Sequence, residues 1–220
     1  MQATAVVVRL SPARQPPPYK LLSLLFQYPD AALLARRAEL AETIQTLPND
    51  RARTAIMRFA AYFITARPLQ LQQEYVTTFD LQKRSGLYLT YYTEGDTRKR
   101  GMALLRLKRI YAAAGLPLEG RELSDYLPVV LEFAALAPQG LGAHILGEHR
   151  TALEVLRTQL RGVESPYRHL VDAVCFGLPG LRRADLDTVK RVLKEGPPHE
   201  EVGLQPFAPP EVMPVTGARR

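Results

Sequence analysis

Apolar residues recur at helical spacing through most of this 220-residue chain, and no stretch of useful length alternates as a strand would. The pattern begins at Tyr19 and ends near Glu195. Residues 11–18 and the segment from Gly196 onward lack it and are rich in proline. We therefore expect a flexible extension at residues 1–18, one helical domain at 19–195, and a disordered, proline-rich tail at 196–220.

Capping residues and prolines divide the helical pattern into about seven to nine helices. Pro29-Asp30, Pro68 and Ser165-Pro166 are each typical of a helix start, and the longest helices are expected at 51–66, 97–114 and 142–161. With 46% hydrophobic residues, a chain of this length can bury a sizeable core. The sequence thus predicts an all-α, single-domain helical bundle.

Composition and motifs argue against several classes of protein. The chain has no glycine-rich phosphate loop and no nucleophile elbow, and its four histidines include no pair at metal-ligand spacing. The single cysteine, Cys175, lies among apolar residues and is expected to be buried and inert. We expect neither an enzyme nor a cofactor or metal site.

No apolar run is long enough for a signal-peptide core or a membrane span, and one cysteine cannot form an intramolecular disulfide. Both observations favour a soluble, cytoplasmic protein without stable membrane association.

The segment from Gly86 to Gly101 places three cations where a helix disfavours them. Gly95-Asp96 predicts a turn and an N-cap, so Arg98, Lys99 and Arg100 fall in the first turn of the next helix. That turn carries the positive end of the helix dipole, where cations are unfavourable. A local rule broken in this way tends to mark function or an obligatory partner.

The three cations do not share one face. Arg98 projects with Arg106 and Arg109 from an outer basic face, whereas Arg100 precedes Ala103, Leu104 and Leu107 on the apolar side. An inward cation needs a partner because burying a lone charge is costly. The candidate partners are carboxylates in similarly apolar surroundings: Glu132, Asp125 and Asp80. Arg100, Asp96, Asp125 and Glu132 are expected to hold the helices of this region in register. Two alternatives remain, in which these charges contact a ligand or simply point to water.

Three segments carry a resemblance to a known family. They are Tyr75–Asp80, the stretch from Leu87 through Gly-Asp-Thr-Arg-Lys-Arg-Gly to Leu104, and Glu122–Phe133 with its Asp-Tyr-Leu-Pro motif. In combination they resemble the NarJ-type assembly chaperones of respiratory nitrate reductase, which are related to the TorD-like redox enzyme maturation chaperones. The resemblance runs from about Leu21 to Leu160.

The resemblance implies a cytoplasmic, all-helical chaperone that is absent from the mature enzyme. Members bind the N-terminal segment of the catalytic α subunit and keep it competent for molybdenum cofactor insertion, so the implied partners are this subunit and the proteins that deliver the cofactor. A peptide helix in a groove requires exposed apolar contacts with charges at the rim. The candidate contacts are Tyr75, Phe79, Leu87, Tyr88, Tyr91, Leu127 and Phe133, with Arg98 and Arg106 at the rim. The competing interpretation is that these apolar residues are ordinary core.

A different class is a helical nucleic-acid-binding regulator that uses the basic face of residues 97–114. The formal net charge of +7 agrees with an anionic partner. Against this class, the basic residues lack interleaved aromatics and a helix-turn-helix frame. We therefore expect a peptide partner and no nucleic acid.

Overall fold

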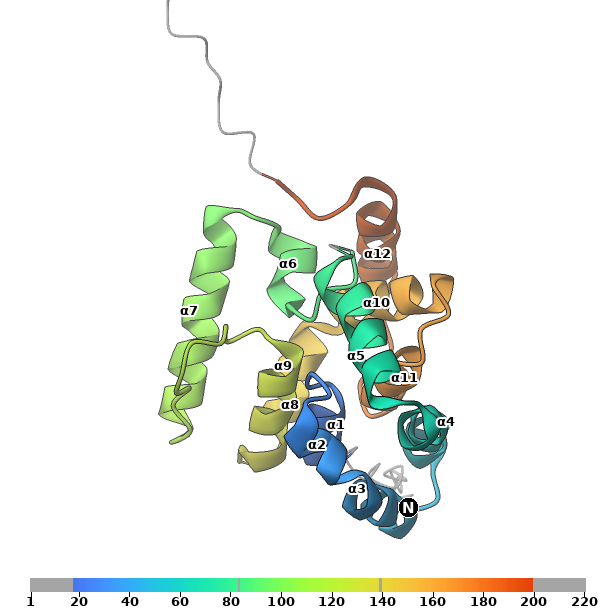
Figure 1. Cartoon of the computed structure of the whole chain (residues 1–220). Helices are drawn as coiled ribbons and strands as arrows, with labels where there is room; N and C mark the ends of the chain where they lie inside the picture. Colours follow the sequence, from blue (N-terminus) through green and yellow to red (C-terminus); the bar gives the residue numbers. More distant parts are fainter. Residues whose placement is uncertain (1–17, 83, 139, 200–220) are drawn as a thin grey trace, which may run out of the picture.

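The computed structural model describes residues 18–82, 84–138 and 140–199, and in these ranges it contains twelve α-helices, one π-helical turn and no strand (Figure 1). The all-α class is therefore confirmed, while the expected count of seven to nine helices is too low. None of the described helices is both long and apolar enough to cross a membrane.

Two predicted helices are each interrupted by one residue. The first divides at Arg36 into α2 (Ala31–Ala35) and α3 (Arg37–Thr46). The second divides at His149, with φ −94° and ψ 17°, into α9 (Leu141–Glu148) and α10 (Arg150–Gly162). Apolar residues keep helical spacing on both sides of each break, so periodicity alone does not reveal it.

The centre of the bundle is formed by helices that are distant in sequence. α1 (Tyr19–Leu25) packs on α8 (Leu127–Leu136), and α4 (Arg51–Thr65) packs on α11 (Arg168–Phe176). Tyr167, which precedes α11, lies 4.8 to 5.9 Å by ring centroids from Phe59, Tyr75 and Phe79. Aromatic pairs at such distances stabilise a core beyond simple area burial.

α8 and α9 approach each other closely at one glycine. A Cβ on Gly142 would lie 2.3 Å from the Cα of Ala134, which is far inside van der Waals contact. Only a residue without a side chain allows this packing.

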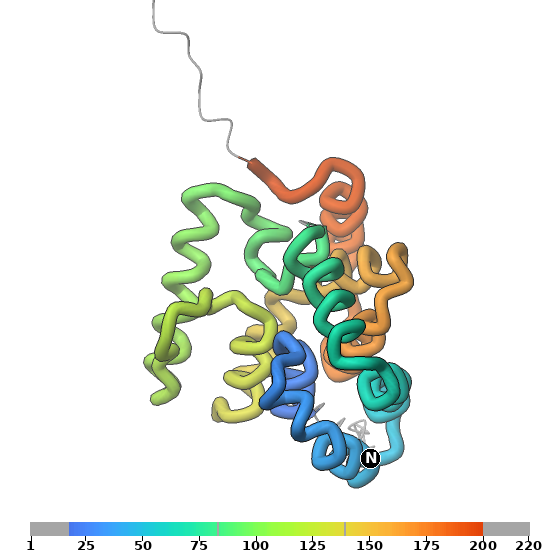
Figure 2. The backbone as a smooth tube through the Cα atoms, viewed as in Figure 1, coloured from blue at the N-terminus to red at the C-terminus, as the bar shows by residue number. Residues whose placement is uncertain are grey.

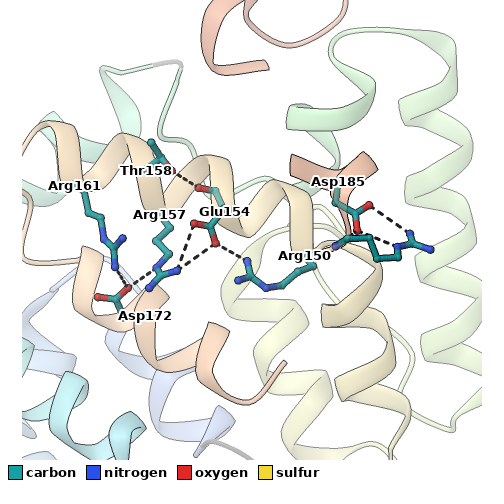
Figure 3. Close-up of polar contacts among 8 residues, drawn as sticks. Arg150, Glu154, Arg157, Thr158, Arg161, Asp172 and Asp185 are labelled. Carbon is teal, nitrogen blue, oxygen red and sulfur yellow. Dashed lines mark hydrogen bonds and ion pairs between the residues drawn. The ribbon is translucent and has the colours of Figure 1, made fainter. Parts of the chain in front are cut away.

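Ion pairs join α10 to α11 (Figure 3). Arg157 and Arg161 of α10 donate to Oδ1 of Asp172 on α11 at 2.5 and 2.8 Å. Glu154 accepts from Arg150 at 2.9 Å and from Arg157 at 3.3 Å. The side chain of Asp172 is largely buried, and several donors compensate the cost of burying this carboxylate.

The middle of the chain forms the edge of the molecule. α5 (Pro68–Tyr75) continues into the π-helical turn η1 (Val76–Asp80), after which the chain reaches α6 (Leu89–Glu94) and α7 (Arg98–Ala113). Figures 1 and 2 both show α7 standing at the border of the bundle, with α6 between it and the helices around α12 (Arg183–Glu195). Two large apolar side chains of α7, Met102 and Leu105, are exposed.

Candidate functional site

An open pocket of about 320 Å³ lies where α6 and α7 meet. Five of its six lining residues come from the segment 86–101 that stands out in the sequence, and the sixth comes from η1. The lining residues are Phe79, Gly86, Tyr88, Tyr91, Asp96 and Arg100. The unusual cations and the aromatic residues of that segment therefore meet in one place.

Backbone pairing with a distant loop positions the pocket wall. The amide of Leu89 donates to the carbonyl of Asp125 at 3.0 Å, and the amide of Leu127 donates to the carbonyl of Leu87 at 2.8 Å. Leu87, Leu89 and Leu127 are buried, so the short pairing is anchored in the core. Tyr88 lies between Leu87 and Leu89 in the sequence, and because neighbouring side chains in an extended segment point to opposite sides, it faces outward into the pocket.

Arg100 lies against the two tyrosine rings of the pocket. Its guanidinium carbon is 5.9 Å from the ring centroid of Tyr88 and 5.6 Å from that of Tyr91, within cation–π range. One terminal nitrogen lies 3.2 Å from Oδ1 of Asp96, and the other lies 3.9 Å from Oδ2 of Asp125. The side chain is 18% exposed, so Arg100 is the inward cation that the helical spacing predicts.

Asp125 is the innermost charged group of the site. It is fully buried, and its Oδ2 accepts from the amide of Thr90 at 3.1 Å and from the hydroxyl of Thr90 at 2.5 Å. Thr90 lies in the first turn of α6, so this carboxylate satisfies one of the unpaired amides at that helix start. Oδ1 has no hydrogen-bond partner among the described residues. Arg100 is thus the cation that compensates the buried charge of Asp125.

The other two carboxylates proposed as inward partners of Arg100 do not contact it, which corrects that expectation. Glu132 pairs with Lys20 of α1, and both side chains are about half exposed. Asp80 is exposed and makes no ion pair with any described residue. Asp125 precedes α8, whereas Glu132 lies within that helix.

The expected N-cap role of Asp96 is also wrong. Thr97 is the residue that precedes α7, and its side chain makes no capping hydrogen bond. Asp96 instead extends to Arg100 four residues later. The dipole cost of the cation in the first turn is therefore offset by a neighbouring carboxylate.

Most of the apolar residues proposed for a peptide groove are packed in the core. Five of them are at most 7% exposed: Tyr75, Phe79, Leu87, Leu127 and Phe133. Of these five only Phe79 also lines the pocket. Tyr88 and Tyr91 are partly exposed, and they are the candidates that a partner can reach without rearrangement of the core.

The outer basic face of α7 is present at the surface, where Arg98, Arg106 and Arg109 are exposed. Arg106 donates to Oε1 of Glu148 in α9 at 2.7 Å, a contact that the sequence pattern does not signal. An ion pair with an exposed cation of this kind contributes little to stability.

Burial makes the ionisable groups near the core poor reactants at neutral pH. Burial and the nearby Glu122 raise the pKa of Tyr88 to about 12, and the Tyr88 hydroxyl donates to that carboxylate at 3.2 Å. Burial raises the pKa of the Cys175 thiol to about 11, so it remains protonated. No group of three or more potential metal ligands occurs among the described residues.

The described part of the chain is an all-helical bundle, and one of its pockets combines tyrosine rings, one cation and one exposed carboxylate. Its fold is similar to that of an Archaeoglobus fulgidus protein described as a redox enzyme maturation protein. The two have a TM-score of 0.54 at 24% identity, over 72% of this chain and 90% of that one.

Sequence comparison then identifies the family. Residues 37–172 match the family described as nitrate reductase delta subunit. A Bacillus subtilis protein described as the nitrate reductase molybdenum cofactor assembly chaperone NarJ is 33% identical over 164 residues, covering 74% of this chain and 89% of that protein. The chain therefore belongs to the nitrate reductase delta subunit family, and it is of the NarJ type.

A longer relative contains the same region as one part of its chain. The nitrate reductase-like protein NarX of Mycobacterium tuberculosis is 36% identical over 157 residues, which are 71% of this chain but 24% of that protein. The chain thus spans about a quarter of the length of NarX.

Proposed function

We propose that this protein is a non-catalytic assembly chaperone of respiratory nitrate reductase. It binds the catalytic α subunit through the N-terminal segment of that subunit and holds it ready for molybdenum cofactor insertion. Residues 19–195 form the chaperone domain, which works in the cytoplasm and also meets the proteins that deliver the cofactor. The names of the NarJ-type relatives support the assembly role.

The observation that carries the peptide-binding part is the pocket between α6 and α7. Tyr88 and Tyr91 offer partly exposed ring faces to an apolar side chain, and Asp96 and Arg100 offer one charge of each sign beside them. An amphipathic peptide helix needs this combination, with apolar anchors at the centre and polar contacts at the rim. Because Asp125 also faces Arg100, the cation stays in place when Asp96 turns to a partner.

The exposed face of α7 extends the proposed contact surface. Lys99 and Arg106 are exposed there beside Met102 and Leu105. Such a face is suited to a partner segment that carries acidic and apolar residues, and long-range attraction would speed its association.

The molybdenum content of the α subunit tests the function directly. We would produce the α subunit with the wild-type chain or with a Tyr88→Ala, Tyr91→Ala variant, in cells without another assembly chaperone, and measure molybdenum per subunit. The variant should lower the content at least fivefold, whereas Met57→Ala, which removes an exposed apolar side chain from α4, should not change it. Equal molybdenum content with and without the wild-type chain would refute the proposed function.

A further inference from the structure

The segment after α12 reaches the turn between α6 and α7 (Figure 1). Pro198 lies so close to Gly95 that a Cβ on Gly95 would be 1.5 Å from the Pro198 carbonyl oxygen. Gly95 also has φ +60°, which L side chains rarely adopt, so both the turn and the close contact require glycine here. Asp96 and His199 form a parallel β-bridge next to this contact.

This contact brings the end of the described chain to the rim of the pocket, because Asp96 is one of its lining residues. Residues 200–220 continue from there. Leu204 and Phe207 follow His199 by five and eight residues, and an extended chain of these lengths reaches at most about 17 and 28 Å. Leu204 and Phe207 are therefore within reach of the pocket, because its lining residue Asp96 pairs with His199.

The charges of the continuing segment complement those of the site. Glu200 and Glu201 come directly after His199, whose bridge partner Asp96 is followed by the cationic first turn of α7. Lys99 is exposed there, and Arg100 is partly exposed. Carboxylates that reach these cations would be favoured by ion pairing and by the positive end of the helix dipole.

The apolar residues of the segment match the aromatic part of the pocket. Leu204 and Phe207 flank Pro206, and Pro209-Pro210 follow. Prolines favour an extended polyproline conformation, which loses little entropy on binding to tyrosine-lined grooves. The segment thus has the chemistry that we ascribe to the partner peptide: acidic residues followed by apolar anchors.

We propose that residues 200–207 occupy the pocket of Tyr88, Tyr91 and Arg100 in the unliganded chain and compete with the partner peptide. This inference rests on the proposed function in so far as the partner uses the same pocket. A tethered segment has an effective concentration in the millimolar range, so even an intrinsic dissociation constant near 1 mM lowers the apparent affinity for the partner about two- to tenfold.

Paramagnetic relaxation in the full-length protein tests the self-docking without any partner. A nitroxide at Gln205→Cys leaves Leu204 and Phe207 intact, and because Cys175 is buried the unaltered chain serves as the labelling control. The label should broaden the amide resonances of Tyr88 and Tyr91. Adding Leu204→Ser and Phe207→Ser should weaken the broadening, whereas adding Val215→Ser should not. Absence of broadening in the otherwise unaltered tail, or equal broadening in the Leu204→Ser, Phe207→Ser variant, would overturn the inference.

A second measurement separates this inference from the proposed function. The full-length Leu204→Ser, Phe207→Ser variant should bind a synthetic peptide of the α-subunit N-terminus two- to tenfold more tightly than the wild type, and Val215→Ser should bind like the wild type. Peptide binding without broadening, and with unchanged affinity in the variant, overturns the self-docking and leaves the function standing. Broadening without any peptide binding supports the self-docking and contradicts the function.

Discussion

Replacing Arg100 with alanine should destabilise the fold by about 2–4 kcal/mol. Asp125 is fully buried and lies 3.9 Å from the guanidinium, a separation that corresponds to about 4 kcal/mol at an effective dielectric constant near 20. Part of this attraction is offset because Arg100 no longer has to be desolvated. The second contact, with the exposed Asp96, adds little.

Urea unfolding followed by circular dichroism measures this loss. Arg109→Ala is the matched control, since Arg109 is exposed on the same helix and its removal should change the unfolding free energy by less than about 0.5 kcal/mol. Asp125→Asn removes the buried charge, and combining it with Arg100→Ala should recover about 1–3 kcal/mol in a double-mutant cycle. A loss below about 0.5 kcal/mol for Arg100→Ala, together with no coupling, would show that Arg100 is solvated and would refute this reasoning.

Two further predictions concern the core. Gly142→Ala forces α8 and α9 apart and should lower the free energy of unfolding in urea by about 1–3 kcal/mol. Gly147 lies in the same helix but faces open space, so Gly147→Ala should raise that free energy by about 0.5–1 kcal/mol. Equal effects of the two substitutions would contradict the close packing at Gly142. Burial raises the pKa of Cys175 from 9.0 to about 11, so the folded state disfavours the thiolate and stability falls as pH rises between these values. The unfolding free energies of the wild type and Cys175→Ala should therefore converge over that range, and a constant difference would count against a buried thiol.

The sequence predicts the helical class and the inward direction of Arg100 because both follow from periodicity. Helical spacing places Arg100 on the side of Leu104 and Leu107, and the structure shows Leu107 buried and Arg100 largely covered. The same reasoning places Arg98 and Arg106 on the outer face, where they are exposed. These features depend on one helix alone, so a local pattern suffices.

The partner of Arg100 depends on tertiary structure and could not be predicted in the same way. Asp125 reaches the site because Leu87 and Leu89 pair through their backbones with a loop more than thirty residues later in the chain. This pairing is too short to produce an alternating pattern of apolar and polar residues in the sequence. The spacing of apolar residues also does not show whether a given side chain is buried in the core or lies at the surface, where a partner could cover it. Tyr75 and Tyr88 both look like groove residues in sequence, but only Tyr88 is at the surface.

Calorimetric titration of the full-length chain with a synthetic peptide of the α-subunit N-terminus tests the central claim most directly. We predict saturable one-to-one binding that Tyr88→Ala and Tyr91→Ala each weaken at least tenfold, about 1.4 kcal/mol, while Met57→Ala leaves it unchanged. A parallel titration with duplex DNA at physiological salt should show no tight binding. No peptide heat, together with tight and steeply salt-dependent DNA binding, would contradict the account.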